Sequence, residues 1–195
     1  MEEPRIEGTE AKLLDARLSR RALLGMGVMG AAVLALPAPL RAAVTRRQGE
    51  RALRFVHTHT GESGRIVFWA NGLYVPDGQA QLDRLLRDHY SDAVHRIDPG
   101  LLQLLYRLNG ALGTSEPFHV ISAYRSPEVN ARLAARSGGV AKHSLHTQAK
   151  AIDIRVPGRD LTTLRKAALA LGGGGVGFYP KSNFVHVDVG RVRRW

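Results

Sequence analysis

The chain contains no cysteine among its 195 residues. Disulfide bonds therefore contribute nothing to its fold, and any metal site must be built from histidine and carboxylate side chains rather than from thiolates. Aromatic residues are also few, at 6%, but the hydrophobic fraction of 44% suffices for a packed core and excludes a chain that is disordered throughout. The length is that of one domain.

Acidic residues are the minority among the charged ones, with 17 Asp and Glu against 28 Lys and Arg and a formal net charge of +11. This basic balance favours contact with polyanions such as nucleic acid, anionic lipid or cell-wall polymers, or it reflects a solvated basic surface. The arginines are spread along the chain, and no zinc-finger, helix-turn-helix or RNA-binding motif accompanies them. We therefore expect no nucleic-acid partner.

The sequence lacks a long apolar run. Its main apolar stretch, residues 22–38, has about 17 residues rich in Gly and Ala, whereas a membrane-spanning helix needs about 20. The stretch follows the pair Arg20-Arg21, which is the twin-arginine export pattern, and the small residues Ala42-Ala43 offer a cleavage point. We predict a twin-arginine signal peptide at residues 1–42, a mature periplasmic domain at residues 43–195, and no stable membrane insertion after cleavage.

Beyond residue 50 the pattern of apolar residues changes repeatedly between the period of a strand and that of a helix. The expected strands are residues 51–60, 65–69, 119–123, 151–156, 176–179 and 184–189. The expected helices are residues 79–89, one that opens at Pro99, 127–136, and 161–171 with Asp160 as its cap. Strands and helices do not alternate regularly, so we expect an α+β fold with a mostly antiparallel sheet and flanking helices.

Two histidines, His57 and His59, lie two positions apart on the first expected strand and would share one of its faces. Such a pair can bind a metal or serve the structure alone. Because the neighbouring sequence offers no third ligand, the structural interpretation is favoured.

Two later strands carry ionisable residues between β-branched ones, in Ile152-Asp153-Ile154 and in Val185-His186-Val187-Asp188-Val189. Alternation along a strand places the apolar side chains on one face and Asp153, His186 and Asp188 on the other. Ionisable groups at such a depth are costly unless they are paired or bind a metal. A buried Asp–His ion pair of structural use is one interpretation, and a metal site is the other.

A third potential ligand, His146, lies seven residues before Asp153, in a loop that can fold over the start of the strand. Two histidines and one carboxylate, with a fourth position open, form a ligand set suited to catalytic zinc.

These residues lie in motifs that resemble a known group of enzymes. Residues 144–153 resemble the S-x-H-x-x-G-x-A-x-D motif, and residues 186–188 the later H-x-D or H-x-H motif, of the D-Ala-D-Ala metallopeptidase superfamily, which shares the hedgehog fold. Within that superfamily the chain resembles the murein endopeptidase K (YcbK-like) family over roughly residues 51–195. The segments that carry this resemblance are residues 57–62, 121–127, 140–146, 174–180 and 191–195.

The resemblance implies one zinc ion bound by His146, Asp153 and His186, a monomer, and hydrolysis of peptide cross-links between peptidoglycan stem peptides in the cell envelope. Ala149 departs from the family motif, which has glycine there. If this position has a positive φ, the added methyl group strains the loop beside the ligand.

Three further residues have expected roles, each beside a simpler alternative: that of Arg125 is implied by the same resemblance, and that of Asp188 by its place two residues after His186 on the same strand face. Arg125 is expected to hold the substrate and the developing oxyanion, or to be a surface arginine at a helix start. Ser144 is expected to hydrogen-bond substrate or to serve a turn. Asp188 is expected to be the general base or to orient His186.

Two other functions are compatible with the same motifs. One is a D,D- or L,D-carboxypeptidase that trims stem-peptide ends with the same zinc chemistry. The other is a non-catalytic, zinc-stabilised module that binds peptidoglycan, because a fold does not by itself specify turnover.

Overall fold

A computed structural model describes residues 49–136, 140–141 and 143–195. The predicted export signal, residues 1–42, lies outside the described residues. Residues 46–195 form one compact unit. Within its described part, no helix combines the length and the hydropathy that crossing a membrane requires.

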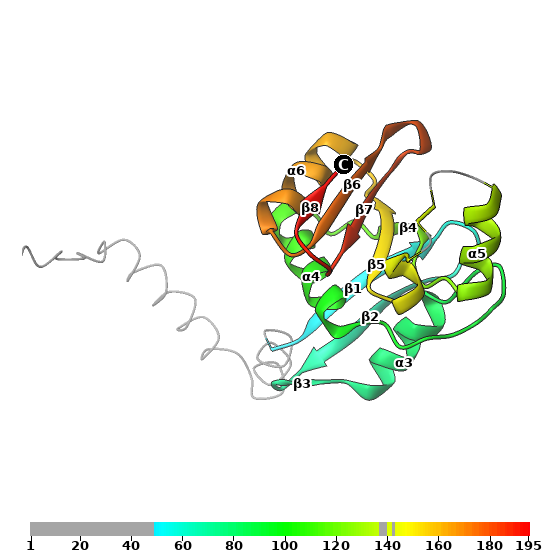
Figure 1. The fold of residues 1–195 in the computed structure, drawn as a ribbon. Helices are drawn as coiled ribbons and strands as arrows, with labels where there is room; N and C mark the ends of the chain where they lie inside the picture. The colour runs from blue at the N-terminus through cyan, green and yellow to red at the C-terminus, as the bar shows by residue number, and fades with distance from the viewer. Residues whose placement is uncertain (1–48, 137–139, 142) are drawn as a thin grey trace, which may run out of the picture. The chain divides into compact units, whose positions relative to one another are not determined.

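One sheet of eight strands organises the domain, in the order β3-β2-β1-β4-β5-β7-β6-β8 (Figure 1). The strands are β1 (Arg51–His57), β2 (Ser63–Ala70), β3 (Leu73–Tyr74), β4 (Phe118–Ser122), β5 (Ala151–Arg155), β6 (Gly175–Tyr179), β7 (Phe184–Asp188) and β8 (Arg193–Arg194). Only the β1–β4 and β6–β8 pairs are parallel. The predicted α+β class and mostly antiparallel sheet are therefore confirmed.

Four α-helices flank the sheet: α3 (Pro76–Leu85), α4 (Pro99–Leu112), α5 (Pro127–Arg136) and α6 (Leu161–Leu171). Helix α3 packs on β2, α4 on β1 and α6, and α6 on β6 and β7. Two short 3-10 turns, η1 (Leu145–Gln148) and η2 (Pro180–Ser182), complete the elements. The apolar face of α4 packs with the inward side chains of β1, β4, β5 and β7 in the core.

Local sequence accounts for most helix ends. The Asp98 carboxylate accepts from the Gly100 amide at the start of α4, and the Asp160 carboxylate accepts from the Thr163 amide at the start of α6. Side-chain oxygens at these positions satisfy amides that have no partner inside the helix. Both helices end at a glycine in the left-handed conformation, Gly113 and Gly172.

Helix α3 is shifted from its predicted position, residues 79–89. It begins earlier because Pro76 is compatible with the first helical turn, where its missing N–H removes no hydrogen bond. It ends earlier because the chain turns after Leu86, whose carbonyl accepts from the Tyr124 amide, and places the Asp88 carboxylate where it accepts from Ser126. These are long-range contacts that helical periodicity does not reveal.

Gly78 sets the distance between α3 and β2. A Cβ atom there would lie 1.9 Å from the carbonyl oxygen of Val67, so even alanine must push the helix away. We predict that Gly78→Ala lowers the free energy of unfolding by about 1–3 kcal/mol, measured by urea denaturation. Gly110→Ala is the matched control on α4: nothing lies within 4 Å of its added Cβ, and a gain of about 0.5–1 kcal/mol is expected. If Gly78→Ala and Gly110→Ala changed the free energy of unfolding equally, the close packing of α3 on β2 at Gly78 would be contradicted.

Candidate metal centre

The candidate site lies where β5 and β7 pair. The antiparallel register places Asp153 directly opposite His186. The residues that flank them, Ile152, Val185 and Val187, are at most 1% exposed and belong to the core. Burial of the apolar side chains on one face therefore forces both ionisable side chains onto the other face, as the sequence pattern predicted.

The third side chain, His146, reaches the site from η1. The Ser144 hydroxyl accepts from the His146 amide at the start of this turn, and the His146 carbonyl accepts from the Arg125 amide. The ring Nδ1 of His146 lies 2.6 Å from the carbonyl oxygen of Ala123. Because a carbonyl only accepts, Nδ1 donates, and the lone pair of Nε2 points into the site.

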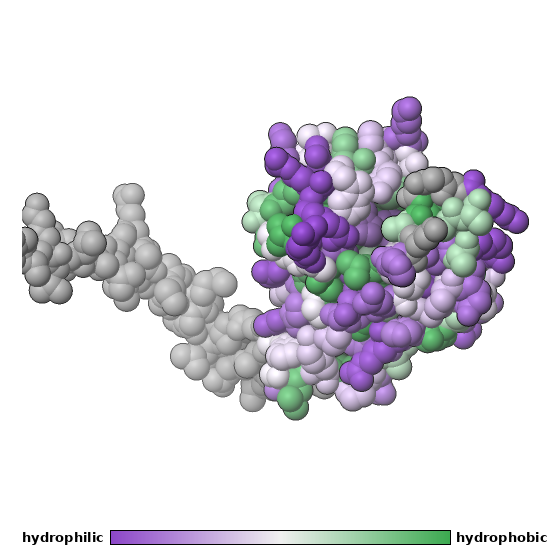
Figure 2. Space-filling view, in the orientation of Figure 1, coloured by the Kyte–Doolittle hydropathy of each residue, from purple (hydrophilic) through white to green (hydrophobic). Residues whose placement is uncertain are grey.

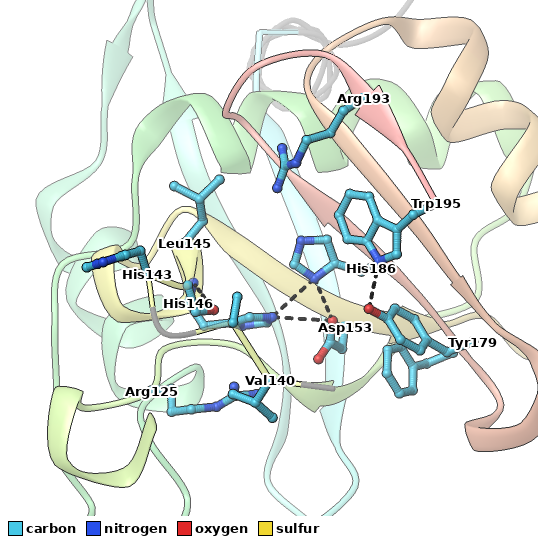
Figure 3. A pocket seen from close by; sticks show the side chains of 13 residues that line it. Arg125, Val140, His143, Leu145, His146, Asp153, Tyr179, His186, Arg193 and Trp195 are labelled. Carbon is cyan, nitrogen blue, oxygen red and sulfur yellow. Dashed lines mark hydrogen bonds and ion pairs between the residues drawn. The ribbon is translucent and has the colours of Figure 1, made fainter. Parts of the chain in front are cut away.

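Three potential ligand atoms converge there (Figure 3). His146 Nε2 lies 3.2 Å from His186 Nδ1 and 3.3 Å from Asp153 Oδ1, and His186 Nδ1 lies 2.8 Å from Asp153 Oδ1. Tetrahedral ligands about 2.1 Å from a zinc ion are about 3.4 Å apart. Among the described residues this is the one group of three such side chains whose ligand atoms lie within 4.8 Å of one another.

The hydrogen bonds behind these side chains leave a set of acceptor atoms that fits a cation. His186 Nε2 lies 3.0 Å from Asp188 Oδ2 and must donate to it, because an ionised carboxylate only accepts. In the neutral ring this leaves a lone pair on Nδ1. Two imidazole lone pairs and a carboxylate oxygen then face one another, which is unfavourable unless a cation lies between them. The donor set and its spacing therefore fit zinc.

The pKa values at the site reflect the same electrostatics. Burial alone would raise the pKa of Asp153, but His146 and His186 outweigh it and hold this pKa well below its usual range. Burial would lower the pKa of His186, but the carboxylates of Asp153 and Asp188 outweigh it and raise it. Surroundings that favour a proton on His186 also favour a metal cation beside it.

Asp188 supports His186 from the side opposite Asp153 and is 0% exposed. Its oxygens also accept from the Gly175 and Gly190 amides, at 3.0 and 2.8 Å, and from both terminal nitrogens of Arg193, at 3.0 and 2.7 Å. Burial would raise the pKa of Asp188, but the hydrogen bonds from His186 and Arg193 hold it well below its usual range. Every direction around this carboxylate is occupied by protein donors.

The ligand atoms lie in a pocket of about 390 Å³. Arg125 lies on one side of it, and Tyr179 and Trp195 lie on the other (Figure 3), where the ring of Phe184 stacks on that of Tyr179. The face of the molecule shown in Figure 2 is mainly hydrophilic, with apolar residues gathered between the charged ones. The pocket therefore has a cationic side at Arg125 and an apolar side at Tyr179 and Trp195, around the three potential metal ligands.

Arg125 is held in place by neutral partners. Its guanidinium donates to Asn130 Oδ1 at 3.3 Å and to Ser122 Oγ at 3.2 Å. The Asp88 carboxylate accepts from the next amide, that of Ser126, at 2.8 Å. These contacts fix the loop. Asn130 and Ser122 are neutral and leave the positive charge of the guanidinium uncompensated, so Arg125 can bind an anionic group in the pocket.

Of the other predicted residues, Ser144 lines the pocket, yet its hydroxyl already accepts from His146, which accounts for its role in the turn. His57 and His59 are absent from the cluster of ligand atoms. They gather instead with His89, whose ring stacks on His59 with centroids 4.2 Å apart. Burial, followed by the nearby histidines, lowers the pKa of His57 to about 4.

Ala149 has the positive φ that its place in the motif suggested. It adopts φ 53° and ψ 31° at the end of η1, and its side chain is fully buried. A left-handed non-glycine residue costs roughly 1–2 kcal/mol. The loop that carries His146 therefore contains a strained residue, compensated in part by burial of the methyl group.

The sequence did not reveal the parts played by Arg193, Trp195, Tyr179 and Asp88. Arg193 and Trp195 lie in one of the segments that carried the family resemblance, but nothing in their spacing indicated contact with Asp188 or His186. Asp88 lies in a segment that was predicted to be helical. Their roles depend on contacts across the sheet.

A buried His/Asp/His set at the floor of an open pocket in an α+β domain is an arrangement of metal-dependent hydrolases. Comparison with known proteins agrees: residues 45–195 match the family described as peptidoglycan L,D-endopeptidase MepK. The chain belongs to this family, as its motifs suggested.

Relatives support this assignment over nearly their whole length. The peptidoglycan L,D-endopeptidase MepK of Escherichia coli (strain K12) is 45% identical over 179 residues, which cover 91% of this chain and 97% of the relative. The protein of Shigella flexneri with the same name matches equally well. The probable peptidoglycan L,D-endopeptidase MepK of Haemophilus influenzae is 38% identical over 178 residues, which cover 91% and 95%.

We predict that Asp188→Asn lowers the free energy of unfolding at pH 7 by about 2–4 kcal/mol, because Arg193 and His186 lose a buried charged acceptor. The folded-state pKa of Asp188 is depressed, so its contribution is complete above the unfolded value of about 3.9 and is lost as the pH falls towards the folded value. The difference in the free energy of unfolding between wild type and Asp188→Asn should therefore be about 1 kcal/mol smaller at pH 3 than at pH 7. Urea unfolding at both pH values tests this.

The exposed Asp77→Asn serves as the control and should stay within about 0.5 kcal/mol of wild type at pH 7. If the difference in the free energy of unfolding between wild type and Asp188→Asn were larger in acid, Asp188 could not be the buried ionised acceptor described above.

Proposed function

We propose that this protein is a zinc-dependent endopeptidase that hydrolyses peptide cross-links of peptidoglycan in the periplasm. The observation that carries the proposal is the convergence of His146 Nε2, Asp153 Oδ1 and His186 Nδ1 at 2.8–3.3 Å in an open pocket. Its family and the names of its relatives support the substrate. Those names, L,D-endopeptidase, point to a bond between an L-configured and a D-configured residue.

The proposed ligands are His146, Asp153 and His186, and they would hold one zinc ion. A bound zinc ion polarises the scissile carbonyl and supplies the Lewis acidity for hydrolysis at neutral pH. The chain's own contribution is orientation: Ala123 fixes the tautomer of His146, and Asp188 fixes that of His186.

Arg125 is proposed to bind substrate in the pocket. Its guanidinium can hold a substrate carboxylate or the negative charge that develops on the carbonyl oxygen. For Asp188, the geometry favours the orienting role over that of general base. This carboxylate is fully buried, does not line the pocket, and already accepts from His186, Arg193 and two amides.

Export by the twin-arginine route, with a signal peptide at residues 1–42, is part of the proposal because the substrate lies outside the cytoplasm. The excess of Lys and Arg over Asp and Glu in the chain would also favour association with anionic wall polymers. The runner-up function is a carboxypeptidase on stem peptides: an arginine beside the ligands is also suited to a terminal carboxylate.

The decisive test is digestion of defined muropeptide dimers with the zinc-loaded protein, followed by mass spectrometry. Dimers whose cross-link joins an L- to a D-residue should be converted to monomers, and those joined by two D-residues should be cut more slowly. His186→Ala should lower kcat/KM by more than about 100-fold, because even the partners behind metal ligands cost 10–100-fold. Release of single amino acids would instead identify a carboxypeptidase, and binding without turnover a non-catalytic module.

We also predict that removal of zinc with a chelator abolishes turnover and lowers thermal stability, and that added zinc restores both. At a free zinc concentration about 100 times the Kd, binding should add about 2.7 kcal/mol to the free energy of unfolding. Calorimetry with and without zinc measures this shift. Asp153→Asn, which keeps the shape but loses the charge, should remove most of it, and an undiminished shift in this variant would contradict the ligand assignment.

A further inference from the structure

The segment Arg193–Trp195 is held beside the pocket by backbone hydrogen bonds. Strand β8 pairs in parallel with β6, so that Arg193 lies opposite Gly175. The Trp195 amide donates to the Val176 carbonyl at 3.2 Å, and the Trp195 carbonyl accepts from the Phe178 amide at 3.0 Å. Trp195, the residue directly after β8, is therefore held to β6 through both its amide and its carbonyl group.

The indole ring of Trp195 is fixed as firmly as its backbone. Its Nε1–H donates to the Tyr179 hydroxyl at 2.7 Å, and the guanidinium carbon of Arg193 lies 4.8 Å from the ring centroid. The ring occupies the space that a side chain at position 177 would fill, because a Cβ on Gly177 would come within 2.7 Å of it. A rigid group of this kind loses little entropy when a ligand binds.

The chemistry that this ring presents to the pocket is apolar. Its one polar group, Nε1–H, is already used by Tyr179. Trp195 nevertheless remains 45% exposed and contacts the ring of His186, with centroids 5.3 Å apart. Tyr179 stacks on Phe184, with centroids 4.6 Å apart, and extends the apolar surface. We call Trp195, Tyr179 and Phe184 the aromatic wall.

The position of the aromatic wall indicates what it binds. It lines the same pocket as the proposed zinc ligands, beside His186, while Arg125 lies on the opposite side (Figure 3). A substrate whose carbonyl reaches the ligands must therefore place the residue on one side of the scissile bond against the wall. The indole of Trp195, whose one N–H already donates to Tyr179, presents a face that favours aliphatic carbon over polar groups.

We infer that Trp195 is a specificity-determining residue, whose indole binds the aliphatic portion of the peptide next to the scissile bond. This inference rests on the proposed function and deepens it. Because the contact is made equally in the ground state and the transition state, its loss should raise KM more than it lowers kcat.

Steady-state kinetics on muropeptide dimers test the inference. Trp195→Ala should raise KM about 10–50-fold with kcat within about threefold of wild type, and Trp195→Phe should recover most of the loss. The control is Trp69→Ala, which removes the chain's other tryptophan, a partly buried residue of β2 packed on Tyr74, and should leave KM unchanged. A KM of Trp195→Ala equal to that of wild type would overturn the inference.

A second variant displaces the indole without changing any side chain of the pocket. The added Cβ of Gly177→Ala would lie 2.7–2.8 Å from the indole and must push it aside. Its KM should rise with that of Trp195→Ala, while its zinc content stays that of wild type. If Gly177→Ala fails to fold, Tyr179→Phe, which frees the indole N–H, takes its place and should raise KM severalfold. An unchanged KM in the variant that folds would contradict the inference that the Trp195 indole binds substrate.

Fluorescence gives a readout that does not depend on turnover. In the Trp69→Phe protein, Trp195 is the only remaining tryptophan, and His146→Ala in the same chain prevents hydrolysis. Added muropeptide dimer should shift the Trp195 emission, whereas unchanged emission at saturating dimer would contradict the contact. Failure of the wild-type protein to cleave any dimer would overturn the proposed function. The fluorescence titration would then by itself test whether Trp195 contacts the peptide.

Discussion

The antiparallel pairing of β5 with β7 is the constraint on which the rest of the site depends. It sets Asp153 opposite His186, and burial of Ile152, Ile154, Val185 and Val187 in the core keeps both polar side chains on the other face. A slip of one residue would reverse both faces. The free energy of apolar burial thus holds two proposed ligands together at a depth where burial disfavours the charged form of each.

Two further groups of hydrogen bonds orient the histidine side chains of the site. On one side, the Ala123 carbonyl and the turn after Ser144 aim His146 at the cluster. On the other, Asp188 connects His186 to Arg193, and Arg193 in turn lies over Trp195. Arg193, which holds the carboxylate that orients His186, and Trp195, which belongs to the aromatic wall, therefore lie in one short segment. A change in β8 is expected to affect both ligand geometry and substrate contact.

Glycines make this arrangement possible in a small volume. A Cβ on Gly175 would lie 2.5 Å from Asp188 Oδ2 and 2.3 Å from Arg193, and one on Gly177 would overlap the indole. The glycine-rich stretch before β6 reads in the sequence as the end of a helix, and Gly172 does end α6. Gly175 and Gly177 have another purpose, which is to let the side chains of Asp188, Arg193 and Trp195 lie directly on β6.

The sequence by itself determined the α+β class, most strands and helices, and the identity of the three clustered side chains, because alternation and capping are local properties and the motif is compact. It also indicated strain at Ala149, where φ is positive. Tertiary structure alone decided the rest. The orienting role proposed for Asp188 rests on donors from Gly175, Gly190 and Arg193, and the place of Trp195 in the aromatic wall depends on the pairing of β8 with β6. Such contacts join residues whose spacing along the chain carries no period, so only the folded sheet brings them together.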